Sequence, residues 1–245
     1  MKLSVVIPAY NEEGYIGACL KSVLREGCRA GLDLEVIVVN NASTDRTPEV
    51  VRSIPGVCLV DEPRKGLARA RHRGYLESHG ELIANIDADC KVRKGYFDRA
   101  IRAFDRNPRL ALLSGPFFYH DLPPVAQIGS IIFYFFSIFP NVLGQRILKL
   151  GAVAQGGNFV VRRSALDRIG GYDTSLIFHG EDTDIAIRLS RVGLVRFSFR
   201  QVMTTSGRRL RKEGTFRAGV VYTLNIIFMM IYKKVLTNTH EDVRS

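Results

Sequence analysis

The chain has 245 residues, of which 46% are hydrophobic and 24% are charged. This composition is that of a globular protein with a sizeable core, and it excludes an intrinsically disordered chain. Lysine and arginine number 35 against 24 aspartates and glutamates, so the formal net charge is +11. A chain this basic is expected to meet phosphates, carried by nucleotides, nucleic acid or an anionic membrane. The 4 cysteines form no C-x-x-C pair, which disfavours a zinc site or a disulfide framework and favours a reducing cytoplasm.

Short β-branched runs alternate with helical stretches through the first half of the chain. We expect strands at residues 3–7, 34–39, 57–60 and 81–86. We expect helices between them at residues 15–25, 47–53 and 67–78. Strand, helix and strand at this spacing predict a parallel sheet with right-handed crossovers. Ligands of such sheets bind beyond the carboxyl ends of the strands, where this chain has polar clusters at residues 10–13, 40–45 and 87–89.

Two uncharged segments mark the second half of the chain, at residues 125–144 and 218–232. Gly129, Pro140 and polar residues weaken a membrane span in the first segment, and the second is short for a span. We favour helices that lie in a membrane interface, with core or dimer packing and a true span as the alternatives. The apolar run at the N-terminus ends at Pro8, which is too short for a signal peptide and predicts a buried first strand.

The triplet Asp87-Ala88-Asp89 directly follows the fourth expected strand. In an extended chain, residues i and i+2 point to the same side, so the two carboxylates would face one way. Such a pair can bind one Mg²⁺ or Mn²⁺ ion and present it to phosphate oxygens. A D-x-D triplet also occurs in solvated turns, but its position at the end of an apolar strand favours a metal–diphosphate site.

The loop after the second strand, at residues 40–45, supports two interpretations. Ser43 or Asp45 would cap the helix that follows. The polar side chains of the loop, beginning with Asn40 and Asn41, could in addition pair with a nucleotide base edge.

Two further segments could contact a ligand. A cationic stretch surrounds Gly66 and consists of Arg64, Lys65, Arg69, Arg71 and Arg73. Arg69 and Arg73 share one helix face, which either neutralises a diphosphate or is solvated surface. Gly156 and Gly157 predict a turn that feeds a strand and permits close backbone approach to a ligand.

Glu181 and Asp182 precede a run of apolar residues with helical period. The helix dipole stabilises carboxylates at such a position, which is a sufficient structural explanation. Alternatively, one carboxylate takes the proton of an acceptor hydroxyl as a general base. Further on, residues 191–217 are strongly basic and could bind RNA, anionic lipid or a leaving diphosphate. Few aromatic residues interleave this run, which disfavours stacking on single-stranded nucleic acid.

In this order the segments resemble the family 2 glycosyltransferases, an inverting family with the GT-A fold. The similarity covers about residues 3–215. The opening strand and its loop resemble the family's nucleotide loop, and residues 40–45 stand where the family carries Asp-Asp-Gly-Ser-x-Asp. The remaining matches are the G-x-x-x-A-R-N-x-G helix at 66–74, D-x-D at 87–89, the acceptor-side segments at 157–158 and 170–173, and the E-D pair at 181–182.

The resemblance implies an α/β fold: a Rossmann-like, mostly parallel mixed sheet with helices on both faces, followed by C-terminal apolar and basic helices. It implies catalysis by Asp182, with Glu181 beside it, and a divalent cation, Mn²⁺ or Mg²⁺, held by Asp89 and Asp87. It implies a nucleotide-sugar site formed by Pro8, Ala9, Tyr10, Glu12, Asn40, Asn41, Lys65, Gly66, Arg69, Arg71, Asp87, Ala88, Asp89, Gly157, Asn158, Arg208 and Arg209.

The chain departs from the family pattern at three places. It has no tryptophan, so the Q-x-x-R-W motif that processive members carry near the position of Arg208 and Arg209 is absent, and processive polymerisation is not expected. His72 stands where an asparagine is usual. Asn40 stands where an aspartate is usual. Because a carboxylate suits the two N–H groups of guanine and an amide suits uracil, Asn40 favours a uridine donor.

We therefore expect a glycosyltransferase domain at residues 1–215, with a nucleotide-binding half at 1–115 and an acceptor half at 116–215. Residues 216–245 would form an apolar helix and tail. The expected reaction moves a sugar from a nucleotide diphosphate sugar to an acceptor hydroxyl or phosphate. The expected acceptor is a glycan, or a polyprenyl-linked or other glycolipid of the cell envelope. The expected location is the cytoplasmic face of the membrane, on its anionic surface, with no nucleic acid partner and the oligomeric state open.

Three alternatives stay open on the sequence. A non-catalytic basic module that binds membrane or nucleic acid would need neither Asp89 nor Asp182. A nucleotidyltransferase would carry a glycine-rich phosphate loop after the first strand, but the first glycine here is Gly14. An inactive relative of the glycosyltransferases is disfavoured by the intact D-x-D and E-D pairs.

Overall fold

The computed structural model describes residues 2–129, 131, 134, 154–176 and 180–213. The apolar segment expected at 218–232 and most of the one expected at 125–144 lie outside these residues. Among the residues that the structure describes, no helix is long and apolar enough to cross a membrane. The boundary expected after residue 215 stays a prediction.

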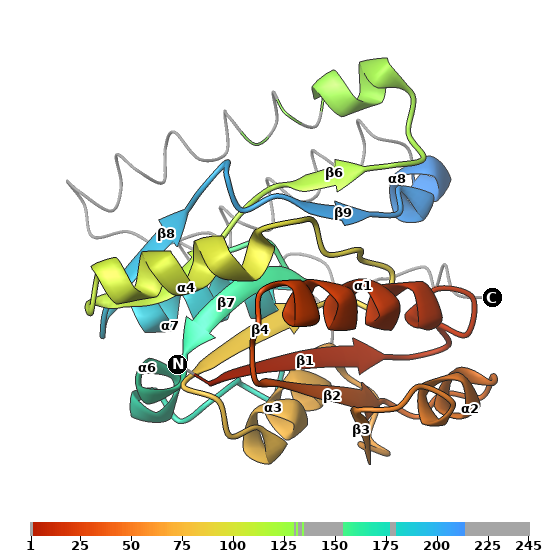
Figure 1. Cartoon of the computed structure of the whole chain (residues 1–245), viewed down its shortest axis with the longest axis horizontal. Helices are drawn as coiled ribbons and strands as arrows, with labels where there is room; N and C mark the ends of the chain where they lie inside the picture. Colours follow the sequence, from red (N-terminus) through yellow and green to blue (C-terminus); the bar gives the residue numbers. More distant parts are fainter. Residues whose placement is uncertain (1, 130, 132–133, 135–153, 177–179, 214–245) are drawn as a thin grey trace.

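A mixed sheet of seven strands forms the centre of the molecule, in the order β3-β2-β1-β4-β7-β5-β8 (Figure 1). Its strands are β1 (Leu3–Ala9), β2 (Leu34–Asn40), β3 (Val57–Asp61), β4 (Leu82–Ile86), β5 (Leu110–Ser114), β7 (Asn158–Arg162) and β8 (Leu194–Phe197). Neighbours among the first four strands run parallel, whereas β7 runs antiparallel to both β4 and β5. The expected mostly parallel mixed sheet is confirmed, and the strands expected in the first half end within two residues of their expected positions.

Helices cover both faces of this sheet (Figure 1). One face carries α1 (Ile16–Arg29), α2 (Thr47–Arg52) and α4 (Tyr96–Arg106). The other face carries α3 (Leu67–Glu77), α6 (Arg163–Arg168) and α7 (Glu181–Ser190).

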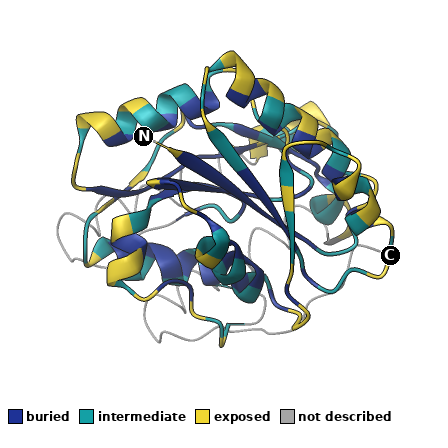
Figure 2. Cartoon of the chain, turned by 60° about the horizontal axis from the view of Figure 1, so that its bottom comes forward, coloured by how far each residue is buried: buried dark blue, intermediate teal, exposed yellow. Residues whose placement is uncertain are grey.

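The central strand β1 is a continuous apolar run because it is covered on both faces, and all of its residues are buried (Figure 2). Its residues alternate between the two cores, with Val5 and Ile7 on the α1 side and Val6 on the α3 side. Burial of one such side chain contributes about 1.5–3 kcal/mol.

The order of the strands reverses between β1 and β4. The pairing of β1 with β2 continues to Ala9 opposite Asn40, but its pairing with β4 ends at Val6 opposite Asn85. Pro8, which has no N–H to donate, lies beyond that last β4 pair. Open α/β sheets bind their ligands outside the carboxyl ends of the strands at such a reversal.

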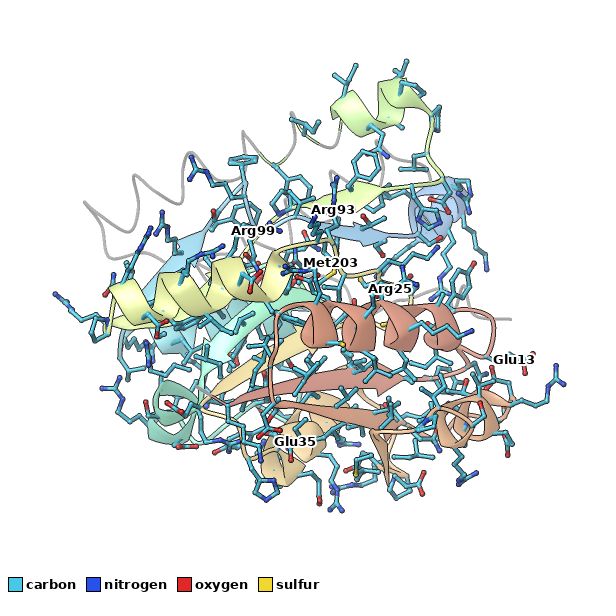
Figure 3. All side chains as sticks on the ribbon, in the orientation of Figure 1. Glu13, Arg25, Glu35, Arg93, Arg99 and Met203 are labelled. Atoms are coloured by element: carbon cyan, nitrogen blue, oxygen red, sulfur yellow. The ribbon has the colours of Figure 1, made fainter. Side chains whose placement is uncertain are left out.

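A second, two-stranded parallel sheet lies beyond α4 and consists of β6 (Phe117–Tyr119) and β9 (Met203–Thr205) (Figure 1). Met203 points from β9 into the core shared with α4 (Figure 3). Lys91 and Thr204 exchange backbone hydrogen bonds of 2.7 and 3.2 Å. The small sheet, and α8 (Arg208–Glu213) after it, are thereby tied to the chain just past Asp89.

Candidate active site

The loop after β1 is fixed by contacts with two other loops. The Glu12 N–H donates to the Thr47 hydroxyl at 2.8 Å, and the Glu12 side chain is buried. The Lys65 ammonium donates to the Tyr10 hydroxyl at 2.6 Å and lies 4.2 Å from the centre of the Tyr10 ring. All three of these residues, Tyr10, Glu12 and Lys65, are expected in the donor site. They lie at the edge of the sheet where the buried strand β1 ends at Ala9.

The buried side chain of Asn41 forms hydrogen bonds that support this edge of the sheet. Its Nδ2 donates to the carbonyls of Glu62 and Arg64 at 3.0 and 2.8 Å, and its Oδ1 accepts the Gly66 N–H at 2.9 Å. These bonds fix the loop that leads into α3. Gly66 has a φ of 147°, which favours glycine. The base contact expected from Asn41 does not fit this position, because the side chain is buried and its amide is engaged.

Asn40 is paired with a carboxylate from the next strand. Its Nδ2 donates to Asp61 at 2.8 Å, and its Oδ1 accepts the Ser43 N–H at 3.1 Å. Two residues on, Ala42 has a φ of 61°, a left-handed conformation that costs an alanine about 1–2 kcal/mol. The family pattern has glycine at this position. The N-cap residue of α2 is Arg46 rather than Ser43 or Asp45, but Asp45, just before it, accepts the N–H of Thr47, the first residue of the helix, at 3.0 Å.

The D-x-D motif forms a turn. The Cys90 N–H donates to the Asp87 carbonyl at 3.0 Å, and Ala88 is buried in the core. The extended conformation expected for this triplet is wrong, because the chain turns where β4 ends. The two carboxylates consequently meet different partners. Asp87 accepts a 3.1 Å bond from Arg71, and Asp89 accepts a 3.3 Å bond from the Thr205 hydroxyl.

Arg71 is a fully buried charge that joins two motifs. Its Nη2 lies 3.1 Å from Asp87 and its Nη1 lies 2.6 Å from Glu181, and its side chain is 1% exposed. Burial alone would lower the pKa of Arg71, but the charges of Glu181 and Asp87 raise it, so the guanidinium stays protonated. One side chain of α3 therefore connects D-x-D, at the end of β4, with E-D, at the start of α7.

The other two arginines of α3 point away from Arg71. Arg69 donates to the Thr174 carbonyl at 3.3 Å, and Arg73 forms a 2.8 Å ion pair with Glu77. Helix geometry places both on the side opposite Arg71. The diphosphate-binding face expected from Arg69 and Arg73 is thus a different face from the one that reaches the D-x-D motif.

Gly156 and Gly157 lie against both carboxylate motifs. The Gly156 N–H donates to Asp182 Oδ2 at 3.0 Å. Gly157 has a φ of 72°, and a Cβ added to it would lie 2.2 Å from the carboxyl carbon of Asp87. A Cβ added to Gly156 would lie 3.2 Å from Asp182 and 3.4 Å from Glu181. Gly157 is therefore required by its backbone conformation and by the close approach of Asp87, whereas at Gly156 the carboxylates leave only a narrow space.

The two carboxylates of E-D differ in their surroundings. Asp182 is half-buried and accepts the Thr183 N–H at 2.7 Å in the first turn of α7. Glu181 is buried against Arg71. Burial and the charge of Asp182 raise the pKa of Glu181 to about 7, although Arg71 acts in the opposite direction. The geometry suits Asp182 as a general base and Glu181 as the residue that holds Arg71.

Arg208 reaches the site from α8. Its Nη2 lies 2.5 Å from Glu12 and 3.4 Å from Asp89, and its guanidinium carbon lies 4.5 Å from the centre of the Tyr15 ring. The structure therefore brings Arg208 to the D-x-D motif from far along the sequence. Arg209 is the next residue of α8 and is half-buried.

Asn158, at the start of β7, is a supporting residue. Its side chain is fully buried. It accepts the Tyr96 hydroxyl at 2.9 Å and donates to the carbonyls of Gly115, Pro116 and Gln201 at 2.8, 3.1 and 3.0 Å. The donor contact expected from Asn158 does not fit this position, because every polar atom of the side chain is engaged inside the protein.

The D-x-D carboxylates suit a cation that shares its coordination with a substrate. Among the described residues, no group of three or more His, Cys, Asp or Glu side chains gathers as a complete metal site. Mg²⁺ and similar hard cations are commonly held by one or two carboxylates, with waters and substrate phosphates as the other ligands. Burial raises the pKa of Cys19 and Cys90, so these neighbouring thiols stay protonated and are poor ligands. Asp89 and Asp87 therefore fit a cation bound together with a diphosphate.

Sequence reasoning missed three residues of this site: Asp61, Thr205 and Tyr15. Asp61 stands opposite Asn40 in the register of β2 and β3, so a sheet register would have found it. Thr205 lies in a strand of three residues, and Tyr15 contacts Arg208 from the end of the first loop. Neither of these two carries a signal in the local sequence.

Comparison with known protein families and curated proteins supports the same interpretation. The family model described as Glycosyl transferase family 2 matches residues 4–170. The probable glycosyltransferase YdaM of Bacillus subtilis is 28% identical over 212 residues, which cover 80% of this chain and 48% of the relative. Glycosyltransferase AglE of Haloferax volcanii is 26% identical over 186 residues, which cover 73% of this chain and 58% of the relative. The chain thus spans about half the length of these relatives.

Solved structures share the fold. The mannosyltransferase PcManGT from Pyrobaculum calidifontis, in complex with GDP-Man and Mn²⁺, has a TM-score of 0.73 at 21% identity, covering 95% of this chain and 63% of that one. Glucosyl-3-phosphoglycerate synthase from Mycobacterium tuberculosis, in complex with Mn²⁺, UDP-Glc and phosphoglyceric acid, has a TM-score of 0.61 at 19% identity, covering 94% and 78%. The fold is that of the GT-A glycosyltransferases. With the family match, this defines the class of protein as a glycosyltransferase. The chain belongs to glycosyl transferase family 2.

Proposed function

We propose that this protein is an inverting, metal-dependent glycosyltransferase, in which Asp182 is the general base. The observation that carries the proposal is the position of Gly156 and Gly157. This pair lies against Asp87 on one side and donates a hydrogen bond to Asp182 on the other. A donor diphosphate at the D-x-D motif and an acceptor at Asp182 would meet across two residues that have no Cβ to separate them.

In this mechanism, Asp182 takes the proton of the acceptor hydroxyl as the oxygen attacks the anomeric carbon of the sugar. The bond from that carbon to the diphosphate breaks on the opposite side, which inverts the configuration. A bound divalent cation would supply Lewis-acid stabilisation of the leaving diphosphate. The N–H groups of Gly156 and Thr183 orient the Asp182 carboxylate. Arg71 of α3 pairs with both Asp87 and Glu181 and fixes the positions of these two side chains.

The proposed donor is a nucleoside diphosphate sugar, with uridine as the preferred nucleoside. Two similar structures are complexes with GDP-Man and UDP-Glc. In this chain, Asn40 uses one N–H on Asp61 and one lone pair on Ser43. One N–H and one lone pair are left for a base, which is the pattern that the N–H of uracil and its neighbouring carbonyl require. A tighter affinity for GDP than for UDP would contradict this preference.

The proposed acceptor is a glycan or a lipid-linked acceptor, such as a polyprenyl phosphate or a glycolipid of the cell envelope, at the cytoplasmic face of the membrane. The net charge of +11 and the basic run at 208–212 support an anionic surface as the partner. Retention of the protein on anionic vesicles at low salt, and its release at high salt, would be the expected behaviour.

The donor site is tested by the thermal stability of the protein with UDP, GDP, CDP and TDP, each with and without Mn²⁺. A ligand that binds only the folded state raises its stability by mass action. We expect a shift with UDP that requires the metal and disappears in Asp89→Ala. Asp105→Ala, an exposed carboxylate of α4, is the matched control and should keep the shift. No shift with any of the four diphosphates would contradict the proposed donor site.

The base is tested by Asp182→Asn, which keeps the shape and the bond from Gly156 but cannot accept a proton. We expect kcat to fall by about 10²–10⁴-fold, with donor binding unchanged. The anomeric configuration of the product, read by NMR on the wild-type reaction, should be opposite to that of the donor. Retention of configuration would contradict direct displacement.

A further inference from the structure

A group of exposed apolar side chains lies on β6, on the helical segment 124–129 with Ile131, and on the connection from β8 to β9 (Figure 1). The members of this group, which we call the apolar face, are Phe118 (43% exposed), Val125 (81%), Ile128 (58%), Ile131 (57%) and Phe199 (47%). Val125, Ile128 and Ile131 follow one another at three-residue spacing on helical backbone, so they share one side of the helix. Several large apolar side chains exposed on neighbouring segments indicate an interaction site.

Contacts of the described residues link the segments that carry the apolar face. The Tyr119 N–H of β6 donates to the Gln127 side chain at 3.3 Å, which ties β6 to the helical segment. The ring of Tyr134 lies 5.9 Å from the ring of Phe197. Phe197 in turn lies 5.8 Å from Phe199. The segments that carry the apolar face are therefore neighbours in space.

Basic side chains lie beside two members of the apolar face, Phe118 and Phe199. The Arg93 guanidinium lies 5.4 Å from the centre of the Phe118 ring, beside the β6–β9 sheet (Figure 3). Arg196 and Arg200 flank Phe199 and are exposed. Asp121 is the one acidic residue in the sequence of 117–134, and it is bonded to Arg211 at 2.7 Å. The apolar face therefore has arginines near Phe118 and Phe199, and its one acidic neighbour in the sequence 117–134 is already paired.

We propose that the apolar face docks on the surface of an anionic lipid bilayer. Aliphatic and aromatic side chains interleaved with arginine are the composition of an interfacial membrane contact. A second copy of the chain is a poorer occupant, because two-fold contact of this face with itself would bring its arginines together without acidic partners. A bilayer rich in anionic headgroups complements both the apolar side chains and the charge.

The apolar face is joined to the candidate active site through the small sheet. Thr204 pairs with Lys91 just past the D-x-D turn, and Thr205 bonds Asp89. Docking by β6 and its neighbours would therefore place the site beside the bilayer, where a lipid-linked acceptor resides. This last step rests on the proposed function, but the docking itself does not.

The test uses the full chain and sedimentation with vesicles of phosphatidylcholine alone or with phosphatidylglycerol. We expect binding to the anionic vesicles and little binding to the neutral ones. Val125→Ser combined with Ile128→Ser should weaken binding at least about tenfold. Arg93→Gln combined with Arg200→Gln should weaken it at least about tenfold as well. The matched controls are Leu76→Ser, which removes an exposed leucine of α3, and Arg52→Gln, which removes an exposed arginine of α2, and both should bind as the wild type does.

Three results would overturn the proposal. They are equal binding to neutral vesicles, wild-type binding by the Val125/Ile128 double variant, and an equal loss in the two control variants. Sedimentation velocity without vesicles adds a fourth: a dimer that the double variant converts to a monomer would assign the apolar face to a second copy. The metal-dependent UDP shift is measured on the same variants. Because that shift should persist in all of them, a failure of docking is distinguishable from a failure of the donor site.

Discussion

The two aspartates of the D-x-D turn each meet an arginine, and the two pairs differ in kind. Arg71 is 1% exposed and holds Asp87 at 3.1 Å together with Glu181 at 2.6 Å. Arg208 is 16% exposed and lies 3.4 Å from Asp89, with a shorter contact to Glu12. The first arginine comes from a helix packed under the sheet, and the second comes from a short helix past the small sheet.

Because of this difference, we expect the two aspartates of the D-x-D motif to have different roles. A buried charge cannot leave its partners without a large desolvation cost, so Arg71 is a fixed part of the scaffold and keeps Asp87 beside it, although Asp87 itself is 35% exposed. The contact of Arg208 with Asp89 is longer and its arginine is less buried, so it can give way to a stronger cation. We therefore expect Asp89 to be the carboxylate that takes the metal, and Asp87 to be the one that links donor side and base side. The predictions below change one pair at a time.

The largest effect is expected from Arg71→Met. At pH 8, where Glu181 is ionised, the substitution leaves Asp87 and the buried Glu181 without their counter-charge, which should lower the free energy of unfolding by about 3–5 kcal/mol. Urea unfolding followed by circular dichroism measures it. Arg73→Met, two residues along the same helix, removes a surface pair with Glu77 and should cost about 1 kcal/mol or less. Equal losses in the two variants would contradict the difference between the buried and the exposed arginine.

A smaller effect is expected from Glu181→Gln, which keeps an acceptor for Arg71 and should cost about 1–2 kcal/mol at pH 5. Its pH dependence is the sharper test. Burial and Asp182 raise the pKa of Glu181 from 4.5 to about 7, so the folded state holds a proton that the unfolded state releases between these values. That stabilisation is complete below pH 4.5 and is lost as the pH rises through 7.

Glutamine does not titrate in this range, so the disadvantage of Glu181→Gln relative to the wild type should shrink between pH 5 and pH 8. Unfolding of both proteins at the two pH values measures it. A disadvantage that grew with pH would mean that Glu181 is held as a carboxylate, with Arg71 outweighing burial.

The sequence pattern predicts those residues of the site that directly follow a buried strand along the chain. Leu3–Ala9 and Leu82–Ile86 are continuous apolar runs, and their ends locate Glu12 and Asp87 at one edge of a sheet. Pattern alone could not choose among the arginines of α3. Arg69, Arg71 and Arg73 alternate in the sequence, and only packing against the sheet shows that Arg71 is the buried one.

The other residues of the site depend on contacts between distant segments. β6 and β9 are strands of three residues, too short for a period to be recognised, and yet they carry Thr205 and Arg208 to Asp89. The amides of Asn41 and Asn158 fit a donor site by family position, but tertiary hydrogen bonds use them inside the protein. The turn at Asp87 overrides the extended conformation because β4 ends at Ile86.

Arg208→Gln is expected to change the affinities for two ligands in opposite directions. Removal of the cation beside Asp89 should strengthen the binding of Mn²⁺ alone, because no positive charge competes for the carboxylate. The same change should weaken the binding of a nucleoside diphosphate with Mn²⁺ by about tenfold, equivalent to about 1.4 kcal/mol. Isothermal titration calorimetry measures both affinities. Lys212→Gln, on the exposed side of α8, is the control. If both affinities fell together, Arg208 would be a support like Arg71.

The smallest effect concerns the attachment that holds Arg208 in place. Asp121 accepts the Gly207 N–H at 2.5 Å and the Ser206 hydroxyl at 2.7 Å, directly before Arg208. Desolvation raises the pKa of Asp121, but these bonds and the pair with Arg211 outweigh it and lower the pKa to about 2. A lowered carboxyl pKa stabilises the fold above pH 3.8 and loses that effect as the pH falls through 2.

Because Asp121 is partly exposed, its contribution should be about 1 kcal/mol or less. Asp121→Asn should lose that contribution at pH 7 and differ less from the wild type at pH 2.5. It should also weaken diphosphate binding less than Arg208→Gln does, since the arginine itself is intact. Diphosphate affinity that fell as far in Asp121→Asn as in Arg208→Gln would show that the position of Arg208, rather than its charge, decides binding. Arg208 would then differ from Arg71 in how firmly its position is held, and not in whether it gives up its aspartate to a metal ion.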